Sequence, residues 1–353
     1  MSLTDHLIAR IRRTGPLSVA DYMAECLLHP TLGYYTTRDP LGAAGDFTTA
    51  PEISQMFGEL IGLSLAQSWM DQGAPAAFVL AEAGPGRGTL MADILRATRA
   101  VPGFHAGLHL HLIEASPTLR AAQADRLAGH APEWHDSLSE LPSDLPVFFV
   151  ANEFFDALPI RQFIRDGAGW RERRIAQTEG ALSFALTEPT PQPSLDHRLD
   201  DTKDGDLVEL CPAATAISAQ IAQHIAQNGG AALFIDYGDW RSLGDTLQAL
   251  HAHQHVDPLT DPGNCDLTAH VDFEALVQGL PCPHTRLTPQ GVFLERLGIT
   301  QRAQSLASRL EGEPLNALIA AHRRLTHPAE MGTLFKVIGL YPDGQTPPPG
   351  LET

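Results

Sequence analysis

Acidic and amide side chains recur where four short apolar runs end. The runs are "AFVLAEAG", "LHLHLIEAS", "VFFVANEFF" and "AALFIDYG", and their ends carry Glu82, Glu114, Glu153 and Asp236. Such runs are typical of buried parallel strands, whose carboxyl ends meet at the sheet edge where open α/β folds bind ligands. Carboxylates at that edge could accept hydrogen bonds from hydroxyl groups or hold a cationic group.

A glycine-rich turn follows the first run. "EAGPGRG" places Gly84, Gly86 and Gly88 at alternate positions, just before the helical pattern "GTLMADILRATRA". Without Cβ atoms, a ligand can approach the backbone closely, and the amino end of a helix favours an anionic group. Taken alone, the pattern is also compatible with an ordinary tight turn.

The second run ends in Glu114, 30 residues after Gly84. A carboxylate here can accept hydrogen bonds from both ribose hydroxyls, although dinucleotide folds place that acid about 20 residues on; the insertion "AVPGFHAG" accounts for the difference. The alternative is an acid that caps the helix beginning near Ser116. Glycine turn and acid together predict a nucleoside-bearing cofactor, either a nicotinamide dinucleotide or S-adenosylmethionine, and G-x-G-x-G is not the dinucleotide spacing.

The third run continues into "ANEFFDALP", which carries Asn152, Glu153 and Asp156. An amide and two acids beside two phenylalanines would suit a basic or amino-group substrate. The alternative is a capped helix start with both phenylalanines in the core. The fourth run adds Asp236 to the same edge.

Composition narrows the classes of function. The chain has 353 residues and a net charge of -18, which disfavours a nucleic-acid partner. Four scattered cysteines predict a reducing compartment and no disulfide framework. No apolar run reaches membrane-span length, and the amino terminus is that expected of a cytoplasmic protein. We predict no metal site, although one histidine-rich loop holds ligand-type residues: His251, His253, His255, Asp257, Cys265 and His270.

Alternating strands and helices predict an α/β fold with a doubly wound sheet. Ser116 is the expected cap of a second helix with Pro117 at its first position. Residues 160–200 alternate like an inserted antiparallel meander, residues 1–75 carry helical patterns, and "MGTLFKVIGL" is expected to be a last strand. The ending "PDGQTPPPGLET" is expected to be unstructured.

Several stretches together resemble the MidA family of class I methyltransferase-like proteins. They run in the family's order and cover nearly the whole chain: "GYYTTRDPLGAAGDFTTAPEISQMFGE", "EAGPGRGTL", "ANEFFDALPIRQF", "FIDYG", "CDLTAHVDF" and "MGTLFKV".

The resemblance implies an S-adenosylmethionine-dependent methyltransferase with a Rossmann-like, seven-stranded sheet whose last strand is antiparallel. It implies a helical, substrate-covering segment over 1–75, a catalytic domain over 76–340 with insertions at about 160–205 and 240–290, and a disordered tail over 341–353. The three glycines would lie at the methionine part of the cofactor, Glu114 would hold the ribose, and Glu82 is a candidate partner for the ammonium group. The family's signature segment would cover the cofactor through Asp46, Thr48, Thr49 and Glu52.

Mitochondrial members of the family are associated with symmetric dimethylation of an arginine in a respiratory complex I subunit. The resemblance therefore implies a protein substrate, with Glu153 and Asp156 holding the guanidinium, Asn152 beside them and Asp236 in reserve. A eukaryotic member would lie in the mitochondrial matrix. Three alternatives stay open: a cofactor-binding assembly chaperone, a methyltransferase of another protein or small molecule, and a nicotinamide oxidoreductase.

Overall fold

The computed structural model describes residues 2–37, 49–251 and 254–353, which divide into two compact units. Unit 1 comprises Met1–Pro40, Asp156–Thr215 and Asp239–Asp272, and unit 2 comprises Leu41–Phe155, Ala216–Gly238 and Phe273–Thr353. These units differ from the consecutive segments expected from the sequence, because each is assembled from pieces that are distant along the chain.

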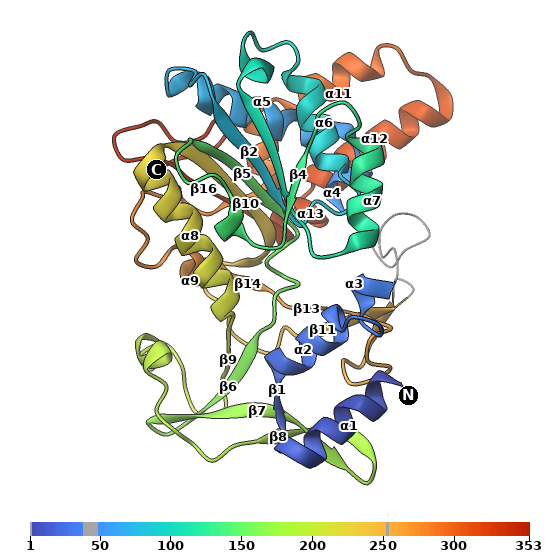
Figure 1. Ribbon diagram of the computed structural model, residues 1–353, viewed down its shortest axis with the longest axis vertical. Coiled ribbons are helices and arrows are strands. Elements are labelled where there is room, and N and C mark those ends of the chain that lie inside the picture. The colour runs from blue at the N-terminus through green and yellow to red at the C-terminus, as the bar shows by residue number, and fades with distance from the viewer. Residues whose placement is uncertain (1, 38–48, 252–253) are drawn as a thin grey trace. The chain divides into compact units, whose positions relative to one another are not determined.

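Unit 2 is built on a sheet of strand order β15-β16-β10-β5-β2-β3-β4 (Figure 1). Neighbours from β10 to β4 pair in parallel, and β16 is antiparallel to β10. The predicted class I fold with an antiparallel last strand is thereby confirmed, although the sheet has eight strands among the described residues rather than the seven expected. The strands are β2 (Phe78–Ala83), β3 (Leu108–Ile113), β4 (Glu133–His135), β5 (Val147–Asn152), β10 (Gly230–Asp239), β15 (Thr288–Pro289) and β16 (Phe335–Leu340).

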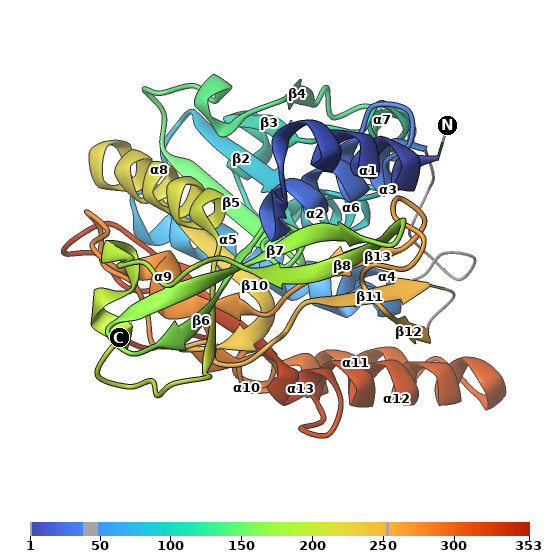
Figure 2. The same cartoon turned by 90° about the horizontal axis from the view of Figure 1, so that it is seen from below.

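Helices cover both faces of this sheet, with α8 on one side and α5 and α6 on the other (Figures 1 and 2). As predicted, Ser116 caps α7 and Pro117 occupies its first turn. The helices are α4 (Ala50–Ile53), α5 (Gln55–Asp71), α6 (Thr89–Thr98), α7 (Pro117–Arg126), α8 (Pro212–Asn228), α9 (Phe273–Val277), α10 (Gln290–Arg296), α11 (Ile299–Ala307), α12 (Gly312–Thr326) and α13 (Met331–Leu334), with short 3-10 turns at Phe104–Ala106 and Leu138–Glu140.

The largest apolar core lies between the sheet and helices α5 and α6. Leu80, Leu112 and Val150 project into it because alternate strand residues share one face. Two glycines of α5 allow the close approach of α6: a Cβ on Gly58 would lie 2.6 Å from the Cβ of Asp93, and one on Gly62 would lie 2.9 Å from the backbone of α6. This packing fixes where α6 begins, directly after the glycine turn.

Unit 1 holds the predicted antiparallel meander. Strand β7 pairs antiparallel with β6, β8 and β1, and a separate three-stranded sheet has the order β12-β11-β13. The elements are α1 (Leu3–Thr14), β1 (Leu17–Ser18), α2 (Val19–Leu28), α3 (Tyr34–Thr37), β6 (Arg161–Asp166), β7 (Gly169–Thr178), β8 (Ala181–Leu186), a 3-10 turn (Pro193–Arg198), β9 (Leu207–Leu210), β11 (Gln248–His251), β12 (Gln254–Val256), β13 (Asp266–Thr268) and β14 (Val271–Asp272).

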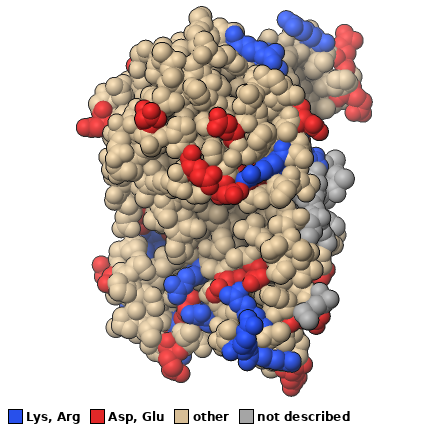
Figure 3. Space-filling model, in the orientation of Figure 1, with Lys and Arg blue, Asp and Glu red and all other residues tan. Residues whose placement is uncertain are grey.

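The densest basic stretch of the sequence, residues 165–174, forms part of this meander. Its Arg171, Arg173 and Arg174 each form an ion pair with a nearby carboxylate. Positive and negative side chains accordingly stand side by side in the lower part of Figure 3, over β7 and β8. The local charge is therefore largely compensated.

Among the described residues, no helix is both long and apolar enough to cross a lipid bilayer.

The tail differs from the expectation of disorder. Leu351 is buried, and the main chain of Glu352 accepts a hydrogen bond from the Arg286 N–H at 2.8 Å. Ser64 donates to the carbonyl of Pro349 at 3.0 Å. The proline-rich composition suggested disorder, but one apolar side chain and several carbonyl groups find partners on unit 2.

A buried carboxylate joins three helices of unit 2. Glu59 of α5 accepts hydrogen bonds from Arg96 of α6 at 2.6 Å and from Arg302 of α11 at 2.8 Å. Burial opposes ionisation, but the hydrogen bonds from Arg302 and Arg96 outweigh it and lower the pKa of Glu59.

We expect Glu59→Gln to reduce the free energy of unfolding by about 1–3 kcal/mol at pH 7, because two guanidinium groups lose their anion while remaining partly hydrated. A carboxyl whose pKa is lowered by folding stabilises the fold above its unfolded pKa and loses that contribution as the pH falls through its folded pKa. In urea unfolding, the difference in free energy of unfolding between the wild type and Glu59→Gln should therefore be smaller at pH 4 than at pH 7. Glu330→Gln, which removes an exposed pair with Arg323, is the control; equal losses in both variants would contradict this.

Candidate cofactor site

The glycine turn begins where β2 ends in unit 2. Gly84, Gly86 and Gly88 have φ values of +62°, +54° and +76°, a region that favours glycine. The Gly84 N–H donates to the carbonyl of Ile113 at 3.0 Å. A Cβ on Gly84 would lie 2.8 Å from the ring of Phe154. Backbone conformation and the covering ring thus both exclude larger residues at the start of the turn.

Glu82 lies on the face of the sheet that α5 and α6 cover, one residue from the end of β2. Its side chain is 3% exposed, and its Oε2 has no hydrogen-bond partner among the described residues. Burial, followed by the charge of Glu114, raises the pKa of Glu82 to about 8, against a smaller opposing contribution from the Met91 N–H. An unpartnered buried carboxyl is costly to the fold and typical of a binding site.

Glu114 follows β3 on the same face. Its Oε1 accepts from the Ser116 N–H at 2.8 Å and its Oε2 from Gln123 Nε2 at 3.2 Å. Burial raises its pKa, partly offset by these hydrogen bonds. Helix capping and ribose binding are compatible at this residue, because a carboxylate can accept about four hydrogen bonds.

The described part of the signature segment forms α4. Thr49 is its N-cap residue, and Glu52 accepts a hydrogen bond from Thr89 Oγ1, in the first turn of α6, at 2.5 Å. Asp46 and Thr48 lie outside the described residues. A hydrogen bond therefore links the described part of the segment to α6, the helix that begins at the glycine turn.

Glu153, after β5, has a left-handed backbone with φ +50°. Its Oε1 accepts from the Ala50 N–H of α4 at 2.8 Å and from Asn152 Nδ2 at 3.2 Å. Asn152 is 7% exposed. A strained conformation at a non-glycine residue persists where the surroundings enforce it, which occurs most often at functional sites.

Asp236, expected as a reserve substrate residue, lies in β10. It is fully buried, its Oδ2 accepts from the Phe154 N–H at 3.1 Å and the Phe155 N–H at 2.9 Å, and its Oδ1 accepts from the Tyr237 N–H at 2.9 Å. These bonds hold the carboxylate against the backbone of the turn after β5.

Asp156 belongs to unit 1. Its carbonyl accepts from the Ala269 N–H at 2.9 Å. In the same unit, Tyr35 donates to Asp266 Oδ1 at 2.9 Å. Loss of hydration, then the charges of Asp266 and Asp156, raises the pKa of Tyr35 well above 10. Unit 1 thus brings together the "GYYTT", "DALP" and "CDLTAH" stretches.

Comparison with known proteins decides the family. Residues 60–285 match the family described as "Putative S-adenosyl-L-methionine-dependent methyltransferase". The chain belongs to this family. It is 39% identical to the protein arginine methyltransferase NDUFAF7, mitochondrial, of Danio rerio, over 95% of this chain and 86% of that one, and 37% identical to the Homo sapiens protein of that name, over 96% and 82%. The resemblance to the MidA family is confirmed.

Solved structures agree with this assignment. A Burkholderia thailandensis protein crystallised with S-adenosyl-homocysteine has a TM-score of 0.83 and 30% identity, covering 96% of this chain and 91% of that one. A native structure from the same organism has a TM-score of 0.79 at the same identity and coverage. The cofactor of this methyltransferase is S-adenosylmethionine, which supplies an activated methyl group.

The residues of unit 2 fit that cofactor chemically. A turn with three glycines lets a ligand approach the backbone closely, Glu114 retains acceptor capacity for two hydroxyls, and the unpartnered Oε2 of Glu82 can accept from an ammonium group. The expected nucleoside chemistry and the observed donors and acceptors are therefore consistent.

Two groups of described residues could hold a metal ion, and neither is the histidine-rich loop. One is His6, Glu25 and His29; the other is His111, Glu133 and His135. In the first, Arg10 already pairs with Glu25 at 2.7 Å. In the second, the two histidine rings share a hydrogen bond of 2.8 Å. These existing contacts compete with metal binding. Of the loop, His253 lies outside the described residues.

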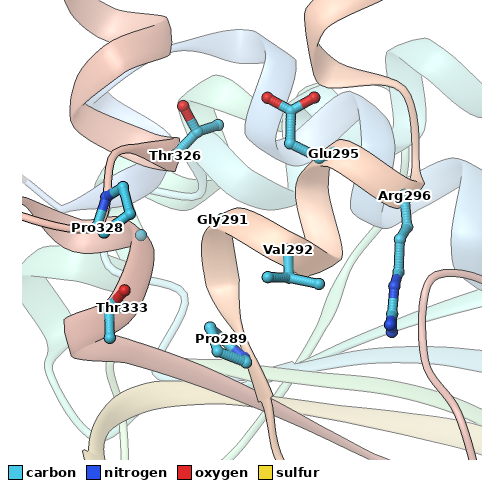
Figure 4. Close-up of a pocket in the computed structure, with 9 residues that line it drawn as sticks. Pro289, Gly291, Val292, Glu295, Arg296, Thr326, Pro328 and Thr333 are labelled. Atoms are coloured by element: carbon cyan, nitrogen blue, oxygen red, sulfur yellow. The ribbon is translucent and has the colours of Figure 1, made fainter.

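A cavity of about 480 Å³ in unit 2 is lined by none of the expected site residues. Figure 4 shows α10 along one side of it, with Val292, Glu295 and Arg296 on that helix, and Thr326, Pro328 and Thr333 on the other. Its lining mixes apolar residues and glycines with the polar or charged Glu295, Arg296, Thr326 and Thr333. The cavity therefore shares no lining residue with the acidic strand ends.

Three residues in contact with the site were missed from the sequence: Thr89, Gln123 and Trp134. Thr89 holds Glu52 of α4, while Gln123 links Glu114 to the glycine turn and receives a hydrogen bond from Trp134. The position of Thr89, right after the turn, was the available signal. Nothing in the sequence pairs a helix glutamine with a tryptophan 11 residues later.

Glu82 predicts a pH-dependent affinity for S-adenosyl-homocysteine, whose ammonium group favours the ionised carboxylate. With a pKa of about 8 in the free protein, Glu82 is mostly protonated at pH 6 and must release a proton when it binds a cation. The dissociation constant should therefore fall as the pH rises from 5.5 to 7, below the range where an α-amino group itself loses its proton, about 7.7–8.0.

Isothermal titration calorimetry in two buffers of different ionisation enthalpy measures both affinity and proton release. Glu82→Gln should remove the proton release and flatten the pH profile. Glu82→Gln titrations that still release a proton to the same extent would show that another group carries the effect.

Proposed function

We propose that this methyltransferase transfers methyl groups to an arginine of a partner protein, forming symmetric dimethylarginine. The observation that supports this best is the relationship to proteins named protein arginine methyltransferase, which are 35–39% identical over at least 95% of the chain. The partner proposed from the family resemblance is a subunit of respiratory complex I. The compartment follows the host: bacterial cytoplasm or mitochondrial matrix.

The cofactor contacts are proposed within unit 2. The three glycines lie at the amino-acid part of the cofactor, Glu82 accepts from its ammonium group and Glu114 from its ribose hydroxyls. Thr49 and Glu52 cover it as part of the signature segment, together with Asp46 and Thr48. The neighbour bound to S-adenosyl-homocysteine supports a site of this kind.

An arginine acceptor sets a specific chemical requirement. The guanidinium stays protonated to a pKa above about 12, so its nitrogen is a poor nucleophile in water. Carboxylates that accept charge-assisted hydrogen bonds from two of its nitrogens can concentrate electron density on the third and aim it at the methyl carbon. Most of the remaining rate enhancement comes from positioning, because the methyl group is already activated.

Glu153 is our first candidate for holding the guanidinium. Its Oε1 accepts from Ala50 and Asn152, which orients the carboxylate, and the strained backbone holds it at the carboxyl end of the sheet. Asp156, at the start of unit 1, is the second candidate. Asn152 is proposed to orient Glu153, and Asp236 to shape the turn between them.

The substrate can be identified directly. Purified protein is incubated with methyl-labelled S-adenosylmethionine and a lysate of cells that lack the protein, and mass spectrometry locates the label. We expect one dominant protein with symmetric dimethylarginine at one site. Label on lysine, on a small molecule, or on no lysate component would overturn the proposed arginine activity.

Glu153→Gln separates binding from catalysis. The amide oxygen of glutamine can still accept from Ala50, so we expect S-adenosyl-homocysteine to bind within about threefold of wild type while methyl transfer falls by about 100-fold, the usual loss for one charge-stabilising group. Glu330→Gln, at an exposed pair in the same unit, is the matched control. Unchanged transfer would remove Glu153 from the mechanism; equal losses of binding and transfer would make it structural.

A further inference from the structure

The side-chain amide of Gln123, in α7, connects the two parts of the cofactor site. Its Nε2 donates to the carbonyl of Gly86, at the centre of the glycine turn, at 2.7 Å and to Glu114 Oε2 at 3.2 Å. The side chain is fully buried. One group therefore bonds both to the backbone that follows β2 and to the acid that follows β3.

Trp134, in β4, fixes which way this amide points. Its indole Nε1–H donates to Gln123 Oε1 at 2.8 Å. An indole nitrogen only donates, so the atom facing it must be the amide oxygen. The NH₂ group then faces two acceptors, the Gly86 carbonyl and the Glu114 carboxylate. All three contacts are satisfied in this orientation alone, whereas the flipped amide would oppose donor to donor and acceptor to acceptor.

Gln123 of α7 lies beside Gly88, the N-cap residue of α6, with room for one Cβ between them. A Cβ on Gly88 would lie 3.5 Å from Cγ of Gln123 and 3.6 Å from Cδ1 of Leu127, which is ordinary van der Waals contact. The glutamine is thus fully buried along its stem and held by hydrogen bonds at its tip. A group restrained at both ends can transmit its position to what it bonds.

We propose that Gln123 is a positioning residue that sets the Glu114 carboxylate and the glycine turn in the geometry that binds the cofactor. The inference rests on the proposed contact between Glu114 and the ribose. Gln123 acts through Glu114 and the Gly86 carbonyl, and touches neither the methyl group nor the acceptor.

The chemistry of the site predicts how replacements differ. Gln123→Leu keeps the bulk but leaves the Gly86 carbonyl and the indole N–H without partners and releases one oxygen of Glu114. Gln123→Glu places a second carboxyl against Glu114, and only its protonated form can donate. Trp134→Phe removes the orienting indole N–H donor while keeping an aromatic ring in its place.

The test measures binding of S-adenosyl-homocysteine, adenosine and 2′,3′-dideoxyadenosine to the full chain. The two nucleosides are measured by their displacement of labelled S-adenosyl-homocysteine. In wild type, adenosine should bind more tightly than the dideoxy analogue, which lacks the ribose hydroxyls. Gln123→Leu should weaken S-adenosyl-homocysteine by about 10-fold or more, the usual effect of losing a hydrogen bond to a charged group. It should also reduce the preference for adenosine, and Trp134→Phe should do the same to a smaller extent.

A pH series adds a readout that a purely structural role would not move. The affinity of Gln123→Glu relative to wild type should recover as the pH falls from 8 to 5.5, because protonation restores a donor. Gln290→Leu is the matched control: Gln290 is also fully buried in unit 2, and its Nε2 donates to a main-chain carbonyl, that of Leu325, at 3.0 Å. It should leave all three affinities unchanged.

Glu114→Gln separates the two proposals. If Glu114→Gln abolishes the preference for adenosine and Gln123→Leu retains it, the role of Gln123 is overturned while that of Glu114 stands. If Glu114→Gln retains the preference, both are overturned. Should Gln123→Leu not fold, Gln123→Glu and Trp134→Phe decide: wild-type nucleoside preference in both, with no pH-dependent recovery, would overturn the proposal.

Discussion

Parallel pairing of β2 with β3 and β5 is the constraint on which the candidate cofactor site depends. In this register Glu82 lies opposite Leu112 of β3 and Val150 of β5, so the carboxyl ends of three strands finish at one edge. Because side chains alternate along a strand, Glu82 and Glu114 fall on the face covered by α6. Burial at that face makes the first carboxyl costly to ionise and the second dependent on donors from α7.

Four acids at strand ends have four different environments. Glu82 has an unpartnered oxygen, Glu114 is partly satisfied, Asp236 is committed to backbone amides, and Glu153 is held in a strained conformation by the start of α4. Identical functional groups therefore differ in what they can still bind. The acids with remaining acceptor capacity suit a ligand, whereas Asp236 accepts from three backbone amides, two of them in the turn after β5.

Segments distant in sequence converge on the glycine turn through few hydrogen bonds. Glu52 of α4 meets Thr89 at the start of α6, and Gln123 of α7 meets the Gly86 carbonyl. Phe154, after β5, covers Gly84. Each contact joins a different segment to the turn, so its shape depends on these segments as well as on its own glycines. This explains how a loop of flexible residues can present one defined surface.

The sequence by itself determined the strands, the acidic residues at their ends, and the family. Apolar runs ending in acids and the turn "EAGPGRG" depend on local periodicity and conformational freedom, which neighbouring residues encode. Of the stretch "MGTLFKVIGL", Phe335–Leu340 joins the sheet as expected, whereas Met331–Leu334 forms α13. Tertiary structure alone decided which acids remain available, because the amides that saturate Asp236 and the tryptophan that orients Gln123 come from other segments. It also decided the tail, whose composition suggested disorder until Leu351 found an apolar surface. Hydrogen-bond partners and burial are properties of the folded assembly, and no local pattern carries them.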